Sequence, residues 1–74
     1  MRGSFARIAR SLPRAIRARR ISLGLTQEEL SNDIGVTPRH YQKIEAGRSN
    51  PTLRTLCAIA DALKISVSEL LALP

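Results

Sequence analysis

Arg39 and Lys43 are the side chains with the clearest chemical potential in this sequence, and they stand four residues apart. At about 100° per residue of a helix, both fall on the face opposite Tyr41 and Ile44. Two cations that face outward together can donate hydrogen bonds to paired acceptors such as O6 and N7 of guanine. A single basic residue more often belongs to a solvated helix face, so the interpretation depends on the elements around this pair.

The cationic pair belongs to a segment that is predicted to form two short helices joined by a tight turn. Amphipathic stretches over Gln27 to Ile34 and Pro38 to Ala46 flank three residues that begin with Gly35. Thr26, with an acid three residues later, has the spacing of a capping box. Gly35 tolerates the left-handed backbone that ends a helix, and Thr37 can cap the next one. These signals together predict a helix-turn-helix.

The same residues resemble the lambda-repressor-like family, the phage repressor, Cro and XRE type of regulator. The resemblance rests on the apolar positions of the two helices, on Gly35 and on the run IEAG at Ile44 to Gly47. It extends from RRISLGLTQEEL at Arg19 to Leu30 through to PTLRTLCAIADALKISVSELL at Pro51 to Leu71, which is roughly residues 12 to 73. It implies a compact all-α domain of five helices, in which the second and third helices form the helix-turn-helix.

The resemblance also implies which residues meet double-stranded DNA, because the second helix of such a motif enters the major groove. The predicted base-reading residues, with His40 on the flank of the helix, are Thr37, Pro38, Arg39, His40 and Lys43. The predicted phosphate contacts, which position a protein without reading sequence, are Gln27, Arg48, Ser49, Asn50 and Arg54. We therefore expect a sequence-specific DNA-binding transcriptional regulator, either a repressor or a controller.

Arg20 is predicted to lie on the apolar side of the first helix and to need a partner there. An unpaired charge in such a position costs several kcal/mol. Glu45 follows Tyr41 by four residues, so the helix turns it inward as well. The family resemblance points to the same Arg20 to Glu45 pair as a structural salt bridge. An architectural role is favoured, although the pair could also direct the arginine toward DNA.

Composition limits the other functions. A chain of 74 residues forms one domain, and its net charge of +6 arises entirely from seven arginines within residues 1 to 20. Such a field favours a polyanion, either nucleic acid or anionic lipid. Cys57 is the single cysteine, and we expect it to be a small buried hydrophobic residue. No Cys/His cluster suggests a metal site, and no cofactor or small-molecule ligand is evident.

The first eleven residues are predicted to be a separate basic arm. Pro13 would break a helix that continued through it, so we expect a flexible arm over 1–11 and a domain over 12–74 whose first helix begins near Leu12. A solvated tail, a DNA-tracking arm and a targeting presequence would all suit this composition. Binding of the arm to a membrane surface is a further alternative.

The C-terminal part is predicted to form two more helices and an interface. Helix four is expected from about Leu53 to Leu63, with Leu53 on its buried side, and helix five begins after Ser66. Helix five carries more apolar side chains than a small core can cover, and those expected to remain for a partner are Val67, Leu71 and Leu73. We expect a homodimer through helix five that binds an inverted-repeat operator.

Other classes of protein are disfavoured by what the sequence contains. One histidine, one cysteine and no glycine-rich phosphate loop give no catalytic constellation, so we do not expect an enzyme. No apolar run approaches the roughly twenty residues of a membrane span, which predicts a cytoplasmic, nucleoid-associated protein. An antitoxin that binds both a protein partner and its own promoter is the alternative function.

Overall fold

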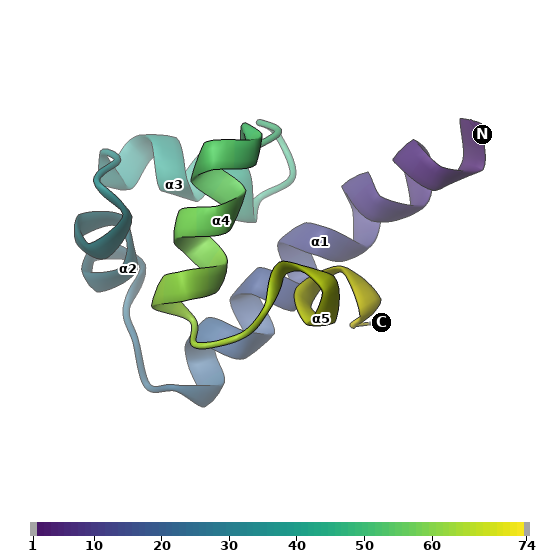
Figure 1. Ribbon diagram of the computed structural model, residues 1–74. Helices are drawn as coiled ribbons and strands as arrows, with labels where there is room; N and C mark the ends of the chain where they lie inside the picture. The colour runs from purple at the N-terminus through teal and green to yellow at the C-terminus, as the bar shows by residue number, and fades with distance from the viewer. Residues whose placement is uncertain (1, 74) are drawn as a thin grey trace.

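The computed structural model describes residues 2–73 as five helices, and it confirms the predicted all-α architecture. The helices are α1 (Arg2–Ser22), α2 (Gln27–Ile34), α3 (Pro38–Glu45), α4 (Leu53–Ala62) and α5 (Val67–Ala72). Figure 1 shows α2 and α3 together at one end, α4 crossing in front of them, and α5 lying against α1. The N-terminal half of α1 projects beyond the body formed by the other helices (Figure 1).

All five helices contribute to one apolar core. Its buried members are Leu12, Ala15, Ile16, Leu30, Tyr41, Ile44, Ile59, Ala60, Leu63 and Leu70. The prediction that Leu53 belongs to this core is wrong, since its side chain is 74% exposed at the first residue of α4. Cys57 is also exposed. It follows the half-buried Leu56 by one residue, which turns it by about 100° away from the core.

The predicted start of the first helix near Leu12 is wrong, because α1 is continuous from Arg2 to Ser22 with Pro13 inside it. A proline in this position lacks the N–H that would bond to the carbonyl four residues earlier, a defect that costs about 3 kcal/mol. Ile8 and Leu12 pack on the core on either side of the defect. The Pro13 ring lies 3.6 Å from the position that a Cβ on Gly47 would occupy. These contacts hold α1 against the core on both sides of Pro13.

Local signals define the two ends of the turn between α2 and α3. Thr26 and Glu29 form the predicted capping box at the start of α2. Gly35 has φ 74° and ends α2 in the left-handed conformation. The Thr37 hydroxyl accepts the backbone N–H of His40 at 3.1 Å, which caps α3. The turn therefore has the predicted geometry, and it fixes the direction of α3 relative to α2.

The end of α4 uses a side chain from α1 in place of a glycine. Lys64 has φ 57°, a left-handed conformation that costs a residue with a Cβ about 1 kcal/mol. Arg19 donates from Nε to the Leu63 carbonyl at 2.9 Å and from Nη2 to the Lys64 carbonyl at 3.2 Å. Its charge also suits the negative end of the helix dipole. These bonds join α1 to the connection that leads into α5.

Candidate nucleic-acid interface

The outward face of α3 carries the predicted base-reading residues. All five of them are exposed: Thr37, Pro38, Arg39, His40 and Lys43. On the opposite face Tyr41 and Ile44 are 0% and 1% exposed. Because the core holds that face, α3 cannot rotate without exposing its apolar side. The first two turns of α3 therefore present a fixed set of donors to a partner.

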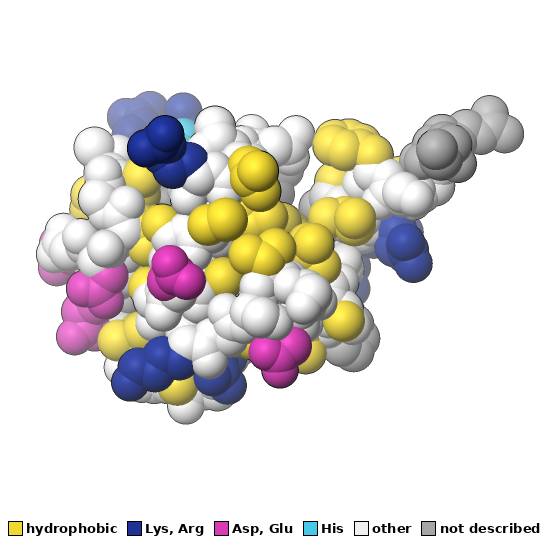
Figure 2. Space-filling model, in the orientation of Figure 1, with side chains coloured by type: hydrophobic (Ala, Val, Ile, Leu, Met, Phe, Trp, Pro, Cys, Tyr) yellow, Lys and Arg dark blue, Asp and Glu magenta, His cyan; other side chains and the backbone are white. Residues whose placement is uncertain are grey.

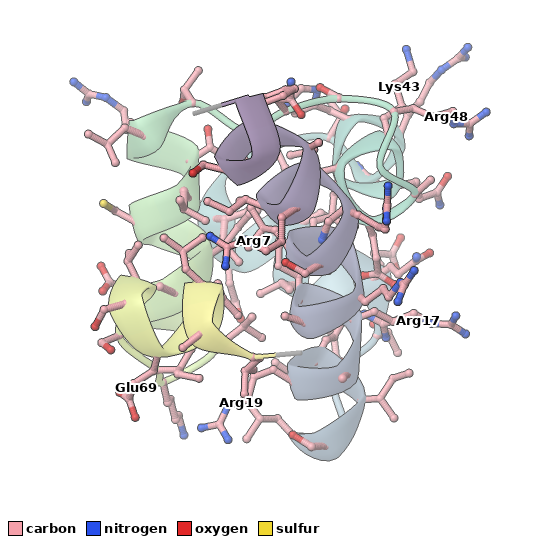
Figure 3. The ribbon with its side chains drawn as sticks, turned by 90° about the vertical axis from the view of Figure 1, so that its right-hand side faces the viewer. Arg7, Arg17, Arg19, Lys43, Arg48 and Glu69 are labelled. Atoms are coloured by element: carbon pink, nitrogen blue, oxygen red, sulfur yellow. The ribbon has the colours of Figure 1, made fainter. Side chains whose placement is uncertain are left out.

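Arg48 extends the cationic surface beyond the end of α3. Its backbone N–H donates to the Lys43 carbonyl at 2.9 Å, which folds the loop back beside the helix. Arg39, Gln42, Lys43 and Arg48 line one open hollow on the surface. Figure 3 shows Lys43 and Arg48 projecting outward next to each other. The structure thus brings a predicted phosphate contact next to the predicted base readers.

The other predicted phosphate contacts surround this surface unevenly. Asn50 and Arg54 are exposed, whereas Gln27 and Ser49 are half-buried. Arg54 lies in the first turn of α4, outside the residues that line the hollow. Figure 2 shows Lys and Arg side chains gathered at the upper edge, over α3 and the start of α4, with a second group at the lower edge. Acidic side chains lie between these two edges.

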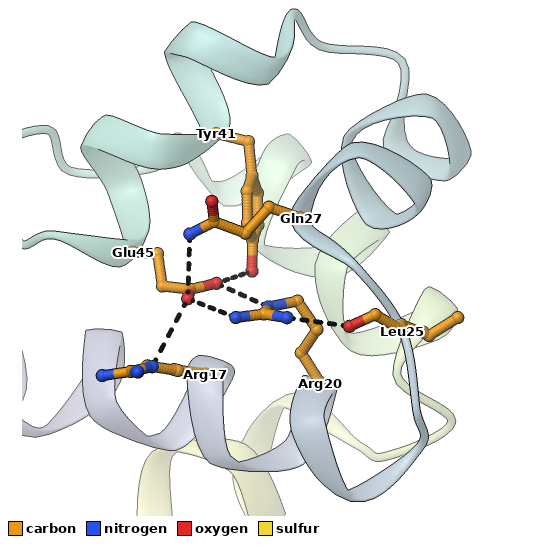
Figure 4. A network of polar contacts seen from close by, with 6 residues as sticks. All are labelled: Arg17, Arg20, Leu25, Gln27, Tyr41 and Glu45. Carbon is orange, nitrogen blue, oxygen red and sulfur yellow. Dashed lines mark hydrogen bonds and ion pairs between the residues drawn. The ribbon is translucent and has the colours of Figure 1, made fainter.

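An ion pair between Arg20 and Glu45 ties α1 to the last turn of α3. Arg20 donates from Nε to Glu45 Oε2 at 3.0 Å and from Nη2 to Oε1 at 2.8 Å. Arg20 Nη1 also donates to the Leu25 carbonyl at 2.8 Å. The side chains are 11% and 4% exposed, so water screens the pair weakly. Figure 4 shows the carboxylate at the centre of contacts from α1, α2 and α3.

Two further hydrogen bonds complete the surroundings of the Glu45 carboxylate. The Tyr41 hydroxyl donates to Oε2, and Gln27 Nε2 donates to Oε1 at 3.2 Å. Burial alone would raise the pKa of Glu45, but the bonds from Arg20, Tyr41 and Gln27 outweigh it and lower that pKa. Burial, and next the bond to the carboxylate, raises the pKa of the Tyr41 phenol. The carboxylate is therefore held ionised and the phenol neutral.

An open groove lies between α1, the start of α2 and α3. Its lining includes Arg17, Gln27 and Gln42, and the Glu45 carboxylate forms part of its wall. The amide donors at the N-terminus of a helix attract anions, and α2 begins at Gln27. One of these donors, the N–H of Glu29, is already used by the Thr26 hydroxyl. The side-chain amide of Gln27 already donates to Glu45. The hydrogen-bond network thus positions the group that is predicted to contact a phosphate.

Sequence reasoning missed three residues of this region. Arg17 lies with Nε 4.0 Å from Glu45 Oε1 and lines the groove, and Gln42 lines both the groove and the hollow. The bond from Tyr41 to Glu45 was not predicted either, although a spacing of four residues on one helix face was sufficient to suggest it. Gln42 could have been predicted as part of the interface, because it precedes Lys43 on the outward side of the predicted helix.

The residues predicted to form a dimer interface are less exposed than expected. Val67, Leu71 and Leu73 are half-buried and pack against the core, because the unbroken α1 covers part of α5. An open groove remains between the two helices, lined by Arg7, Ile8, Ser11, Ser68, Leu71, Ala72 and Leu73. The apolar surface is thus shared between both helices rather than confined to α5.

Within residues 2–73, no group of three or more His, Cys, Asp or Glu side chains is placed to hold a metal ion. None of the helices in this part of the chain combines the length and the apolar character that a membrane crossing requires.

Comparison with known proteins finds similar sequences among regulators. The profile of a family described as Helix-turn-helix matches residues 16–70. The chain is 41% identical over 51 residues to the cryptic phage CTXphi transcriptional repressor RstR of Vibrio cholerae, covering 69% of this chain and 46% of that protein. It is 45% identical over 47 residues to the uncharacterized HTH-type transcriptional regulator y4dJ of Sinorhizobium fredii, covering 64% and 61%. The chain thus spans about half to three fifths of the length of these relatives.

Solved structures with the same fold are also regulators by name. The clp gene regulator ClgR of Corynebacterium glutamicum superposes with a TM-score of 0.83 at 30% identity, covering 86% of this chain and 68% of that chain. A hypothetical transcription factor NHTF from Neisseria superposes with a TM-score of 0.84 at 28% identity, covering 90% and 77%.

Proposed function

This chain belongs to the lambda-repressor-like, XRE-type helix-turn-helix family of transcription regulators, and from that premise we propose that it binds specific duplex DNA through α3. The observation that carries the proposal is the position of Arg39 and Lys43. Both are exposed on the side of α3 that faces away from the buried Tyr41 and Ile44. With Thr37 and His40 they give the N-terminal part of α3 polar groups that read base edges in the major groove, and Pro38 offers an apolar contact there.

Phosphate contacts around α3 hold the protein on the duplex. Arg48 lies beside Lys43, and Asn50 and Ser49 follow in the same loop. Gln27 contributes from the start of α2, and Arg54 from the first turn of α4. These residues supply affinity that is independent of sequence, and they orient α3 in the groove. The Arg20 to Glu45 pair is architectural in this scheme, since it fixes α1 against the end of α3.

The regulator acts as a symmetric homodimer on an inverted-repeat operator. Support comes from the apolar groove that Ile8, Leu71 and Leu73 line between α1 and α5, because a second copy can cover it. A two-fold axis through this surface would place two α3 helices one turn of DNA apart, about 34 Å.

The test of DNA recognition is selection of bound sequences from random duplexes at physiological salt. We expect a pool dominated by one consensus site, which consists of a half-site and its inverted repeat. The same selection with the protein carrying both Arg39→Ala and Lys43→Ala is the control, and it should lose the consensus. A parent protein that returns random sequences would refute the proposal.

The test of assembly is light scattering at tens of micromolar protein, with and without the selected duplex. Leu71→Glu places a charge in the groove and should shift the protein to monomer. Leu53→Glu is the matched control, since Leu53 is 74% exposed on α4 and does not line the groove. A parent that remains monomeric on and off DNA would contradict the dimer and leave DNA recognition standing.

A further inference from the structure

The outer face of α1 carries a row of three arginines that the proposed interface does not use. Arg10, Arg14 and Arg17 are all exposed, and at 3.6 residues per turn they fall within an arc of about 60°. We call these three residues the α1 basic stripe. Arg7 shares a shallow hollow with Arg10 and Arg14, but we leave it out of the stripe because it also lines the groove between α1 and α5 (Figure 3). No acidic residue occurs before Glu28, so nothing on α1 neutralises the stripe.

The opposite side of α1 is fixed in the core, which determines where the stripe points. Leu12 and Ile16 are 7% and 0% exposed, and Ile8 packs against the same cluster one turn earlier. Rotation of α1 would expose these residues to water. The stripe is therefore a rigid surface rather than part of a mobile tail.

The charges of the stripe lack partners within the described chain. Neither Arg10 nor Arg14 forms an ion pair with any residue in 2–73, and Arg17 reaches Glu45 only at 4.0 Å. Arg20 already holds that carboxylate through two hydrogen bonds. Like charges three and four residues apart on a helix repel and destabilise it. A bound polyanion would relieve this repulsion.

The stripe adjoins the candidate interface at its C-terminal end and near its middle. At one end Arg17 lines the groove with Gln27 and Gln42, next to α3. Between Arg10 and Arg14, Pro13 lines a small cavity together with Gly47 and Ser49, which places the middle of α1 beside the loop that follows α3. Figure 3 shows Arg17 and Arg48 projecting on the same side of the molecule. The stripe is thus a lateral extension of the surface proposed to bind DNA.

We propose that the α1 basic stripe binds the phosphate backbone of the same duplex, beside the base pairs that α3 contacts. This inference rests on the proposed function. The distance along α1 from Arg10 to Arg17 is about 10 Å, which matches about three successive phosphates of one strand. A lipid surface is a poorer match, since on the apolar side of α1 Leu12 and Ile16 are buried in the core, and Phe5 is the large apolar side chain left exposed there. The stripe adds affinity and leaves base preference unchanged.

The test compares two variants that change net charge equally. Arg10→Gln combined with Arg14→Gln removes two charges from the stripe. Lys64→Glu also changes the charge by two, but it lies exposed after α4, outside the residues proposed to contact DNA. Dissociation constants are measured against salt concentration for the selected duplex, with the thermal midpoint of each variant as the folding control.

We expect the stripe variant to lower the slope of log K against log salt by about 1.8, because each phosphate contact contributes about 0.9. Between 50 and 200 mM salt the parent should then lose about twelvefold more affinity than the stripe variant. Lys64→Glu should leave the slope close to that of the parent. Extending the duplex by about 10 base pairs beyond the site should strengthen binding by the parent but not by the stripe variant.

The outcomes separate this inference from the proposed function. A stripe variant with the same slope as Lys64→Glu overturns the inference while DNA recognition by α3 remains. A parent that binds no duplex overturns both. Binding of the parent, but not of the stripe variant, to vesicles containing phosphatidylserine, together with unchanged DNA slopes, would assign the stripe to a membrane instead.

Discussion

Arg20 and Glu45 meet through two parallel hydrogen bonds, 3.0 and 2.8 Å long, that join α1 to the last turn of α3. The pair spans 25 residues of sequence, so it links the helix before the motif to the recognition helix itself. Gln27 and Tyr41 share the same carboxylate. Removal of Glu45 would leave donors from three helices without their acceptor.

Glu45→Ala should destabilise the fold by about 3 to 5 kcal/mol, because it leaves the guanidinium of Arg20 buried and unpaired. Urea denaturation followed by circular dichroism measures this loss. Arg20→Met combined with Glu45→Leu should recover much of it, since apolar residues of similar volume remove the need for a partner. An unchanged free energy of unfolding for Glu45→Ala would mean that the carboxylate contributes nothing in solution.

Stability should fall in acid through the same carboxylate. The pKa of Glu45 is lowered from 4.5, so the unfolded chain takes up the proton first as the pH decreases. The contribution of ionised Glu45 is complete above pH 4.5 and is lost as the pH falls through its lowered native pKa. Arg17, Arg20 and Tyr41 are the titratable groups that face it. Urea midpoints from about pH 3 to 6 measure the loss.

Glu45→Gln is the matched control for the acid dependence. Its stability should vary less over the same range, because one titrating carboxylate is missing. Glu29 and Glu69 also have lowered pKa values through their helix caps, but they are present in both proteins. Parallel curves for parent and variant would show that Glu45 does not titrate in this window.

Mutations should distinguish the residues that read bases from the residues that position the protein on phosphates. Arg39→Ala and Lys43→Ala should each relax preference at a different position of the half-site, by about 1 to 3 kcal/mol of discrimination. Arg48→Ala should weaken all duplexes alike and lower the salt slope by about one. Selection with each variant gives the preferences, and titration against salt gives the slopes. A changed consensus for Arg48→Ala would reverse the assignment of these roles.

Pro13→Ala should stabilise the protein by up to about 3 kcal/mol, because it restores an N–H inside a continuous helix. The gain is reduced by the packing energy that the Pro13 ring contributes beside Gly47. Thermal and urea unfolding measure the gain. Pro51→Ala is the control: it lies in the loop before α4, where loss of a proline should slightly destabilise by freeing the unfolded chain. A destabilised Pro13→Ala protein would indicate that the helix begins near Leu12, as the sequence predicted.

The features that sequence predicted well are those determined by neighbouring residues. Thr26 and Thr37 cap α2 and α3, and Gly35 ends α2, because each acts on backbone groups within a few residues. The continuity of α1 across Pro13 depends on packing against residues more than thirty positions away, which no local pattern contains. Leu53 is exposed at the first residue of α4, and helical spacing alone does not show which turn of a helix the core reaches.

The buried phenol of Tyr41 also gives this protein an optical probe of its own. The chain has one tyrosine and no tryptophan, so tyrosine emission comes from a single ring. That ring is 0% exposed and its hydroxyl bonds to Glu45. Emission therefore reports on the core at the junction of α1, α2 and α3. Fraying of the first turn of α1, where Phe5 is 66% exposed, should leave the signal unchanged, and a mismatch with circular dichroism would reveal such partial unfolding without any label.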